Sequence, residues 1–146
     1  MLFRNPRLET TMGRASLGLL IGAVSGALMN AAYVVVSDVL KNGSTPNEVL
    51  SGLLIFGVVS SLFWLGGAFL LATPGWAVLH AMNLRGPGAA VLYGVGLLGG
   101  LMRLLTPLID IWTPYAVAGG IVGLIVWGVS YRPQQAWIEV SSEAGA

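Results

Sequence analysis

Cysteine is absent from this sequence of 146 residues, and charged residues and histidine are scarce. Without cysteine the chain has no disulfide, no thiolate metal ligand and no thiol nucleophile. Only 9% of the residues are charged, against about 25% in a typical soluble domain. The net charge of +1 is too small to indicate nucleic acid as a partner.

The same scarcity limits catalysis. The one histidine, His80, does not make a metal site alone, and no cofactor is expected. No Ser/His/Asp set can be assembled, and no pair of carboxylates lies within one apolar segment for acid–base work. We therefore expect a protein that is not an enzyme.

Hydrophobic residues make up 55% of the chain and fall into four long runs. A membrane-spanning helix needs about 20 mostly apolar residues, and only helices satisfy their own backbone in lipid at these lengths. The sequence predicts an all-α polytopic membrane protein: a cytoplasmic segment 1–14, a bundle of four transmembrane helices within 15–131, and a cytoplasmic tail 132–146. The expected spans are 15–37, 49–72, 88–109 and 114–131.

Helix-breaking residues mark the connections between the spans. The stretch 41–46 separates the first two, and Thr73-Pro74-Gly75 predicts the end of the second. The following segment, 76–85, is too polar to span. It is expected to form a short helix at the membrane surface, with His80 and Arg85 facing water.

Basic residues in the short flanks predict the orientation. Cytoplasmic loops carry an excess of Lys and Arg. Placing both termini in the cytoplasm puts only Lys41 outside and five arginines inside, namely Arg4, Arg7, Arg14, Arg85 and Arg132. Short loops with this bias are typical of a bacterial inner membrane protein.

Many of the 21 glycines recur at helical spacing inside the spans. Small residues let membrane helices approach closely and gain dispersion contacts. We expect close packing within one bundle; the alternative is that one stripe is a surface for self-association. The stripes are Gly18, Gly22 and Gly26 in the first span, Gly96 and Gly100 in the third, and Gly119 and Gly123 in the fourth.

The third span separates into two faces at about 100° per residue. One side, which we expect to face protein, carries Tyr93, Gly96, Gly99, Gly100, Arg103, Pro107 and Asp110. The other side, which we expect to face lipid, carries Val91, Val95, Leu98, Leu101, Met102, Leu105, Leu108 and Ile109.

Arg103 is the only charge well inside an expected span, where an arginine costs from about 2.5 kcal/mol upward. Asp110 lies further along the same face, and Asn30 is expected at a similar depth. Ser60 and Ser61 fall near the middle of the second span. These residues form either a structural polar clamp or a path for a substrate or ion.

Two function classes follow from these patterns. The first is an accessory or scaffold subunit of a membrane complex, whose partners are the lipid bilayer and either other membrane proteins or further copies of the chain. The second is a small oligomeric transporter or channel with Arg103 on a polar interior face.

Overall fold

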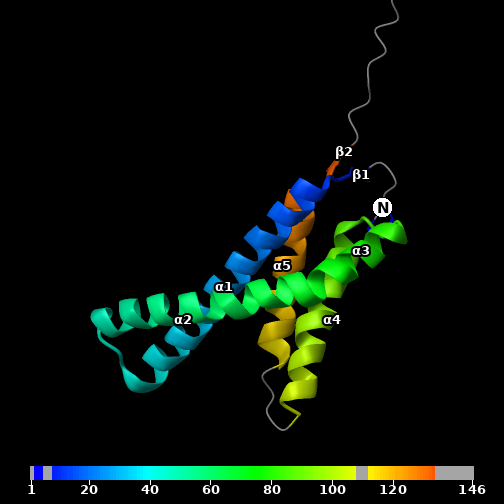
Figure 1. Cartoon of the computed structure of the whole chain (residues 1–146). Helices are drawn as coiled ribbons and strands as arrows, with labels where there is room; N and C mark the ends of the chain where they lie inside the picture. Colours follow the sequence, from blue (N-terminus) through cyan, green and yellow to red (C-terminus); the bar gives the residue numbers. More distant parts are fainter. Residues whose placement is uncertain (1, 5–7, 108–111, 134–146) are drawn as a thin grey trace, which may run out of the picture.

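The computed structural model describes residues 2–4, 8–107 and 112–133. Helices dominate, as expected (Figure 1). The sequence did not predict the short antiparallel pair of strands, each two residues long. The elements are β1 (Leu8–Glu9), α1 (Met12–Asn42), α2 (Pro46–Gly67), the π-helical η1 (Ala68–Ala72), α3 (Thr73–Ala81), α4 (Pro87–Leu105), α5 (Trp112–Ser130) and β2 (Arg132–Pro133).

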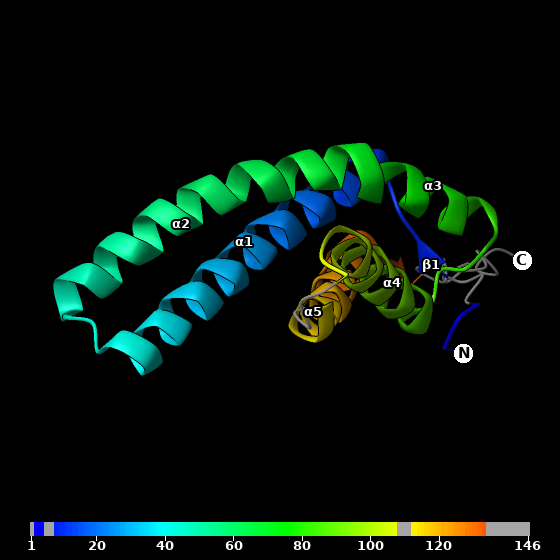
Figure 2. The ribbon, with the colours of Figure 1, turned by 90° about the horizontal axis from the view of Figure 1, so that it is seen from below.

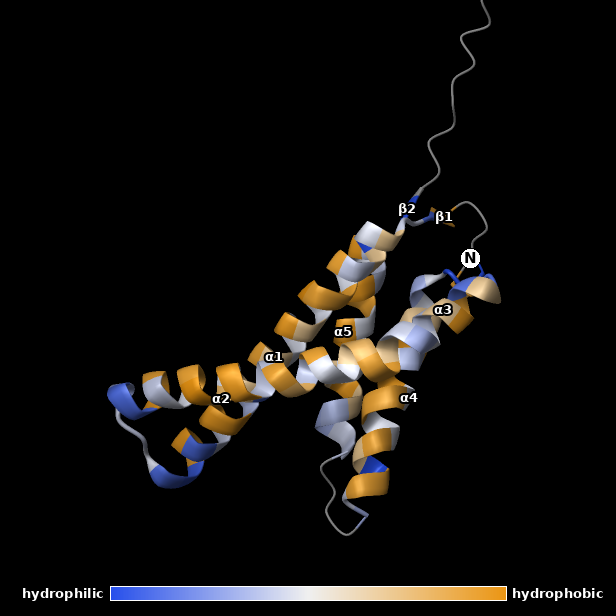
Figure 3. Cartoon of the chain, viewed as in Figure 1, coloured by the Kyte–Doolittle hydropathy of each residue, from blue (hydrophilic) through white to orange (hydrophobic). Residues whose placement is uncertain are grey.

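Four of these helices, taking α2, η1 and α3 as one, are long and apolar enough to cross a membrane. The fold class predicted from the sequence is confirmed to that extent. Figure 3 shows apolar surface along most of their length, with hydrophilic residues gathered at the α1–α2 turn and around the ends of the chain. This is the distribution of a multi-pass membrane protein, in which lipid replaces water around the helices.

Local signals explain the start and end of the first two helices. The Thr11 side chain accepts a hydrogen bond from the backbone N–H of Arg14 and caps α1. Gly43 ends α1 in the left-handed conformation, at φ 70°. In the first turn of α2, the Glu48 carboxylate accepts hydrogen bonds from the backbone N–H and the hydroxyl of Thr45, which lower the pKa of Glu48.

The prediction that Thr73-Pro74-Gly75 ends the second helix is wrong. The helix widens into the π turn η1 and continues as α3 to Ala81, so the whole unit has 36 residues. At about 1.5 Å per residue it measures about 54 Å, against about 30 Å of hydrocarbon. A single perpendicular crossing would therefore leave part of this unit, which carries Glu48 and His80 near its ends, outside the hydrocarbon.

The helices form an open bundle. α4 packs along α5, α5 along α1, and α1 along α2. The α1–α2 hairpin projects away from the α4–α5 pair instead of closing a compact bundle around it (Figures 1 and 2). The other bounds shift by a few residues: α1 extends to Asn42, and α4 ends at Leu105.

Small residues form the interior of this bundle. The buried apolar positions are mostly alanine, and Ala27 and Ala31 on α1 are 0% and 1% exposed. Only small side chains fit where helix backbones approach this closely. The large leucine, isoleucine and phenylalanine side chains lie mainly on the outside, where lipid solvates them.

One end of the bundle gathers both terminal segments. β1 pairs with β2, so Glu9 lies opposite Arg132. Arg14 donates to the carbonyl of Val129, and Arg85 donates to the carbonyl of Leu8. Three arginines thus collect at this end, while Lys41 lies in the last turn of α1 at the opposite end.

Candidate binding groove

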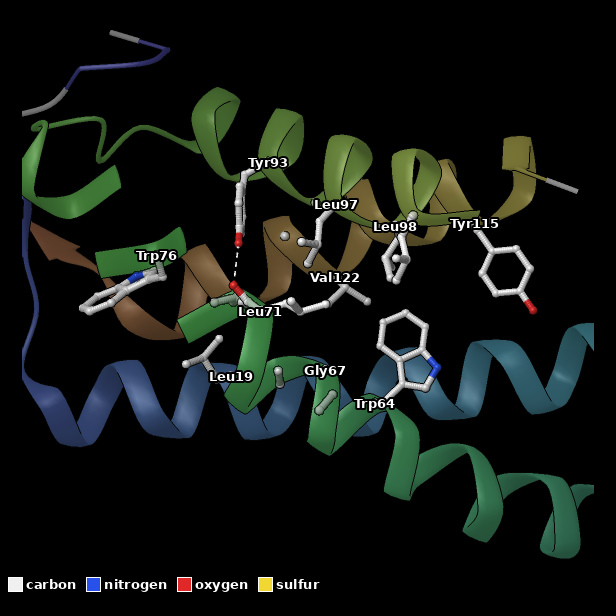
Figure 4. A pocket seen from close by; sticks show the side chains of 18 of the residues that line it. Leu19, Trp64, Gly67, Leu71, Trp76, Tyr93, Leu97, Leu98, Tyr115 and Val122 are labelled. Carbon is white, nitrogen blue, oxygen red and sulfur yellow. Dashed lines mark hydrogen bonds between the residues drawn. The ribbon is translucent and has the colours of Figure 1, made fainter. Parts of the chain in front are cut away.

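The main hollow of the molecule is an apolar groove between the two helical hairpins. Its volume is about 340 Å³. α2, η1 and α3 form one wall, α4 and α5 form the other, and Leu19 and Ala23 of α1 contribute to its floor (Figure 4). The groove runs along α4 from Ala90 to Leu105.

The π turn η1 shapes the wall opposite α4. Pro74 has no N–H and its ring clashes with the carbonyl one turn back, which ordinarily breaks an α-helix. Here the wider turn accommodates the ring. The N–H and the hydroxyl of Thr73 both donate to the carbonyl of Ala68, which satisfies that carbonyl across the bulge.

One hydrogen bond crosses the groove. The Tyr93 hydroxyl on α4 donates to the carbonyl of Leu71 on η1 at 2.8 Å (Figure 4). The aromatic ring of Tyr93 therefore connects the two walls, and its hydroxyl uses a backbone acceptor at the π turn.

A polar node closes the far end of the groove. Asn30 donates to the Ser60 hydroxyl at 2.8 Å and accepts a hydrogen bond from the Tyr115 hydroxyl at 2.9 Å. Three helices, α1, α2 and α5, are connected by these two bonds. Trp64 lies beside the node and packs its ring against Gly26, where there is no space for a Cβ.

An aromatic cluster borders the near end. Trp76, which lines the groove, stacks on His80 with ring centroids 5.3 Å apart, and His80 stacks on Tyr131 at 6.1 Å. The prediction that His80 faces water is therefore wrong: its ring is half-buried, and its Nδ1 lies 3.2 Å from the Tyr131 hydroxyl. Burial, together with the charge of Arg85, lowers the pKa of His80.

The residues expected to form a polar path do not gather in one place. Asn30 and Ser60 meet in the node, whereas Ser61 bonds to the carbonyl of Gly57 in its own helix. Arg103 lies in the last turn of α4 with an exposed side chain, not well inside a span, because α4 ends earlier than expected. Asp110 falls outside the described residues.

The expected faces of the third span are also reversed in part. Gly99, expected to face protein, is buried against Ala116, but Gly94, which was not placed on that face, is buried as well: a Cβ at Gly94 would collide with the carbonyl of Gly119. A Cβ at Gly96 or Gly100 would meet nothing within 4 Å, so the prediction that this pair packs inside the bundle is wrong. Leu98, Leu101, Met102 and Leu105, expected to face lipid, line the groove.

The other glycine stripes lie against neighbouring helices. Gly18 lies against Ser130, and Gly22 against Val126 and Val122. Gly123 lies against the backbone of Ala90. The sequence could not separate these positions from Gly96 and Gly100, because spacing alone does not say which side of a helix a neighbour occupies.

Sequence reasoning placed Tyr93 on the protein-facing side of the third span but did not identify Tyr115, Trp64 or Trp76 as residues of a groove. The pairing of Tyr115 with Asn30 depends on how α1 and α5 lie against each other, as in the Gly18–Ser130 contact, and this contact is not visible in the sequence.

The fold and the groove together define an all-helical protein with four helices long and apolar enough to cross a membrane and with an apolar hollow between its hairpins. Among the described residues, no three His, Asp or Glu side chains are grouped to hold a metal ion. No protein-family model, no curated protein and no solved structure is detectably similar to the chain.

Proposed function

We propose that this protein is an accessory subunit that packs against other helices in a bacterial inner membrane complex. The observation that carries the proposal is the open glycine pair Gly96 and Gly100 on the outer side of α4. The bundle already uses Gly94 and Gly99 of the same helix for its own packing. Two glycines one turn apart leave a notch in which a second helix can approach closely.

The arrangement of the hairpins supports the same role. The contacts run in the order α4, α5, α1, α2, so α2 packs against α1 and leaves most of its surface uncovered. Gly57 and Gly66 of α2 also have open space where a Cβ would lie. If only lipid covered this surface, large apolar side chains could occupy these positions without any loss of packing.

The proposed orientation follows from the basic end of the bundle. Arg14, Arg85 and Arg132 lie at one end, and Lys41 lies at the other. The positive-inside bias then assigns the arginine end, with both termini, to the cytoplasm.

The second function class, a transporter or channel, receives less support. Neither of the two main hollows is lined by Arg103. Asn30 and Ser60 already engage one another and Tyr115. A conduction path needs polar groups that are free to exchange partners with the passing solute.

The test is to tag the C-terminus, extract the chain gently from its own membrane and identify what co-purifies, and in what ratio, by mass spectrometry. We expect a second membrane protein in fixed stoichiometry. Gly100→Leu should lower its recovery without changing abundance of the chain. Gly128→Leu, at an open glycine on another helix, is the matched control and should leave recovery unchanged.

Two outcomes would contradict the proposal. Recovery of the chain alone as a single copy would remove the accessory role. Recovery as a homo-oligomer that carries an ion flux abolished by Arg103→Gln would favour the transporter class instead.

A further inference from the structure

The length and the lining of the groove limit what fits in it. α4 lines it from Ala90 to Leu105, 16 residues that rise about 22 Å at about 1.5 Å per residue. Its volume of about 340 Å³ lies at the lower end of the range for small-molecule pockets, about 300–1,000 Å³. An elongated hollow of this size suits one extended hydrocarbon chain.

The walls favour hydrocarbon over water. They consist mainly of leucine, alanine, valine and glycine. Two of their polar groups already have partners, since Tyr93 donates to Leu71 and Tyr115 donates to Asn30. A buried water needs about two to four polar partners, so the middle of the groove suits methylene groups.

The near end of the groove is basic. Beyond Trp76 lie His80 and Arg85, and Arg14 is bound to the end of α5. The hydrogen bonds of Arg14 and Arg85 go to backbone carbonyls, and within residues 2–4, 8–107 and 112–133 neither arginine forms an ion pair with a carboxylate. The indole Nε1 of Trp76 and Nε of Arg85 are buried and have no hydrogen-bond partner among the described residues.

We propose that the groove holds one acyl chain of an anionic phospholipid, whose phosphate lies at the end formed by Arg14 and Arg85. The hydrocarbon matches the long apolar walls, and the phosphate matches the two arginines, whose side chains bond only to backbone carbonyls among the described residues. A bound chain would connect η1 and α3 to α4 along the whole groove, where the Tyr93–Leu71 hydrogen bond now joins them at one point.

Binding is tested on the full chain in mild detergent, titrated with phosphatidylglycerol or with phosphatidylcholine of identical acyl chains and followed by native mass spectrometry. We expect one tightly retained phosphatidylglycerol per chain. Each arginine near an anionic headgroup should contribute about a fivefold preference over phosphatidylcholine. The preference should fall at high salt, because added ions screen the charges. Equal retention of the two lipids would overturn the proposal.

The position of the acyl chain is tested by filling the groove. Gly67 lines it and has open space where a Cβ would lie, so Gly67→Leu adds bulk without a clash. Displacing about two methylene groups should weaken binding about tenfold. Gly66→Leu adds the same side chain next door at a position that does not line the groove, and should bind as the parent does. Unchanged binding by Gly67→Leu, at unchanged helix content, would overturn the proposal.

The position of the phosphate is tested by two charge-removing variants at opposite ends. Arg85→Gln should weaken binding of phosphatidylglycerol more than binding of phosphatidylcholine, because the choline cation already offsets the phosphate charge of the second lipid, and so the preference should fall. Arg103→Gln, at the far end, should change neither. If Arg103→Gln removes the preference and Arg85→Gln does not, the proposed phosphate position is wrong. The proposal is also wrong if a second copy of the chain displaces the lipid and a dimer forms instead.

Discussion

Replacing Asn30 by leucine should remove both hydrogen bonds of the polar node that connects α1, α2 and α5. The side chain of Asn30 uses its nitrogen toward Ser60 and its oxygen toward Tyr115. Leucine has a similar volume and no polar atom. Both interhelical bonds are therefore lost with little change in packing, and two hydroxyl groups lose their partners.

The magnitude follows from measured interhelical bonds in membranes. Each contributes about 0.6 kcal/mol on average and at most about 1.7 kcal/mol. Since Asn30 makes two, Asn30→Leu should lower the free energy of unfolding by about 1–3 kcal/mol. Tyr115→Phe removes one bond and should lower it by about 0.6–1.7 kcal/mol. The two changes should not add, because Asn30→Leu already breaks the bond to Tyr115.

The assay is reversible unfolding by sodium dodecyl sulfate in mixed micelles, followed by helix content. A double-mutant cycle over Asn30 and Tyr115 gives the coupling energy directly. Ser60→Ala should destabilise the chain, while Ser61→Ala is the matched control, because its hydroxyl bonds only within its own helix. A coupling near zero, with Ser60→Ala and Ser61→Ala alike, would refute the assignment of the node as an interhelical connection.

Three further predictions follow. Gly94→Ala should destabilise the chain by about 1–3 kcal/mol through overpacking, whereas Gly96→Ala should be neutral or slightly stabilising; the same unfolding assay compares them, and equal effects would contradict the packing described. His80, the only histidine, should give one imidazole signal in NMR spectra of histidine-labelled protein and titrate below the ordinary 6.5, because burial and Arg85 favour its neutral form. Stability from this group is then fully present above pH 6.5 and is lost as the pH falls from 6.5 through the lower pKa of His80 in the folded protein, and Arg85→Gln should raise that pKa. Arg103→Gln should change stability by less than about 1 kcal/mol, since its side chain is exposed in a last helical turn; a larger loss would indicate a structural clamp.

The sequence was sufficient for the fold class, because the signal for a membrane helix is simple. Length and composition of an apolar run decide it, and four such runs were present. The turns at Gly43 and before Pro46 were equally clear, since a left-handed glycine and a capping box satisfy the helix ends there. These features depend only on residues close together in the chain.

The end of the second helix was mispredicted because a helix that meets a proline can either end there or continue through a wider turn. Pro74 removes a donor in either case. The helix ends if the freed carbonyls find water, and it continues through a wider turn if other donors satisfy them. Thr73 supplies donors to Ala68, and Tyr93 supplies one to Leu71 from another helix. The second donor is distant in the sequence, so a local rule does not include it.

The groove itself was beyond prediction for a related reason. In a soluble protein, polarity separates the inner from the outer face of a helix. In lipid both faces are apolar, and the distinction is between small and large residues, which Gly94 and Gly96 on α4 do not reveal by themselves. Only the contact with Gly119 on α5 decides which of the two is inside.

The interpretation of Arg103 rested on the cost of a charge at the centre of a bilayer. That cost falls toward helix ends, where a long side chain reaches the interface. With α4 ending at Leu105, the arginine lies two residues from the last helical residue, and its position needs no compensating function. At the other end of the bundle, Arg14 and Arg85 donate to backbone carbonyls near the apolar groove. The proposed lipid site gives a role to this pair, which the sequence indicated only as part of the charge bias between the two sides.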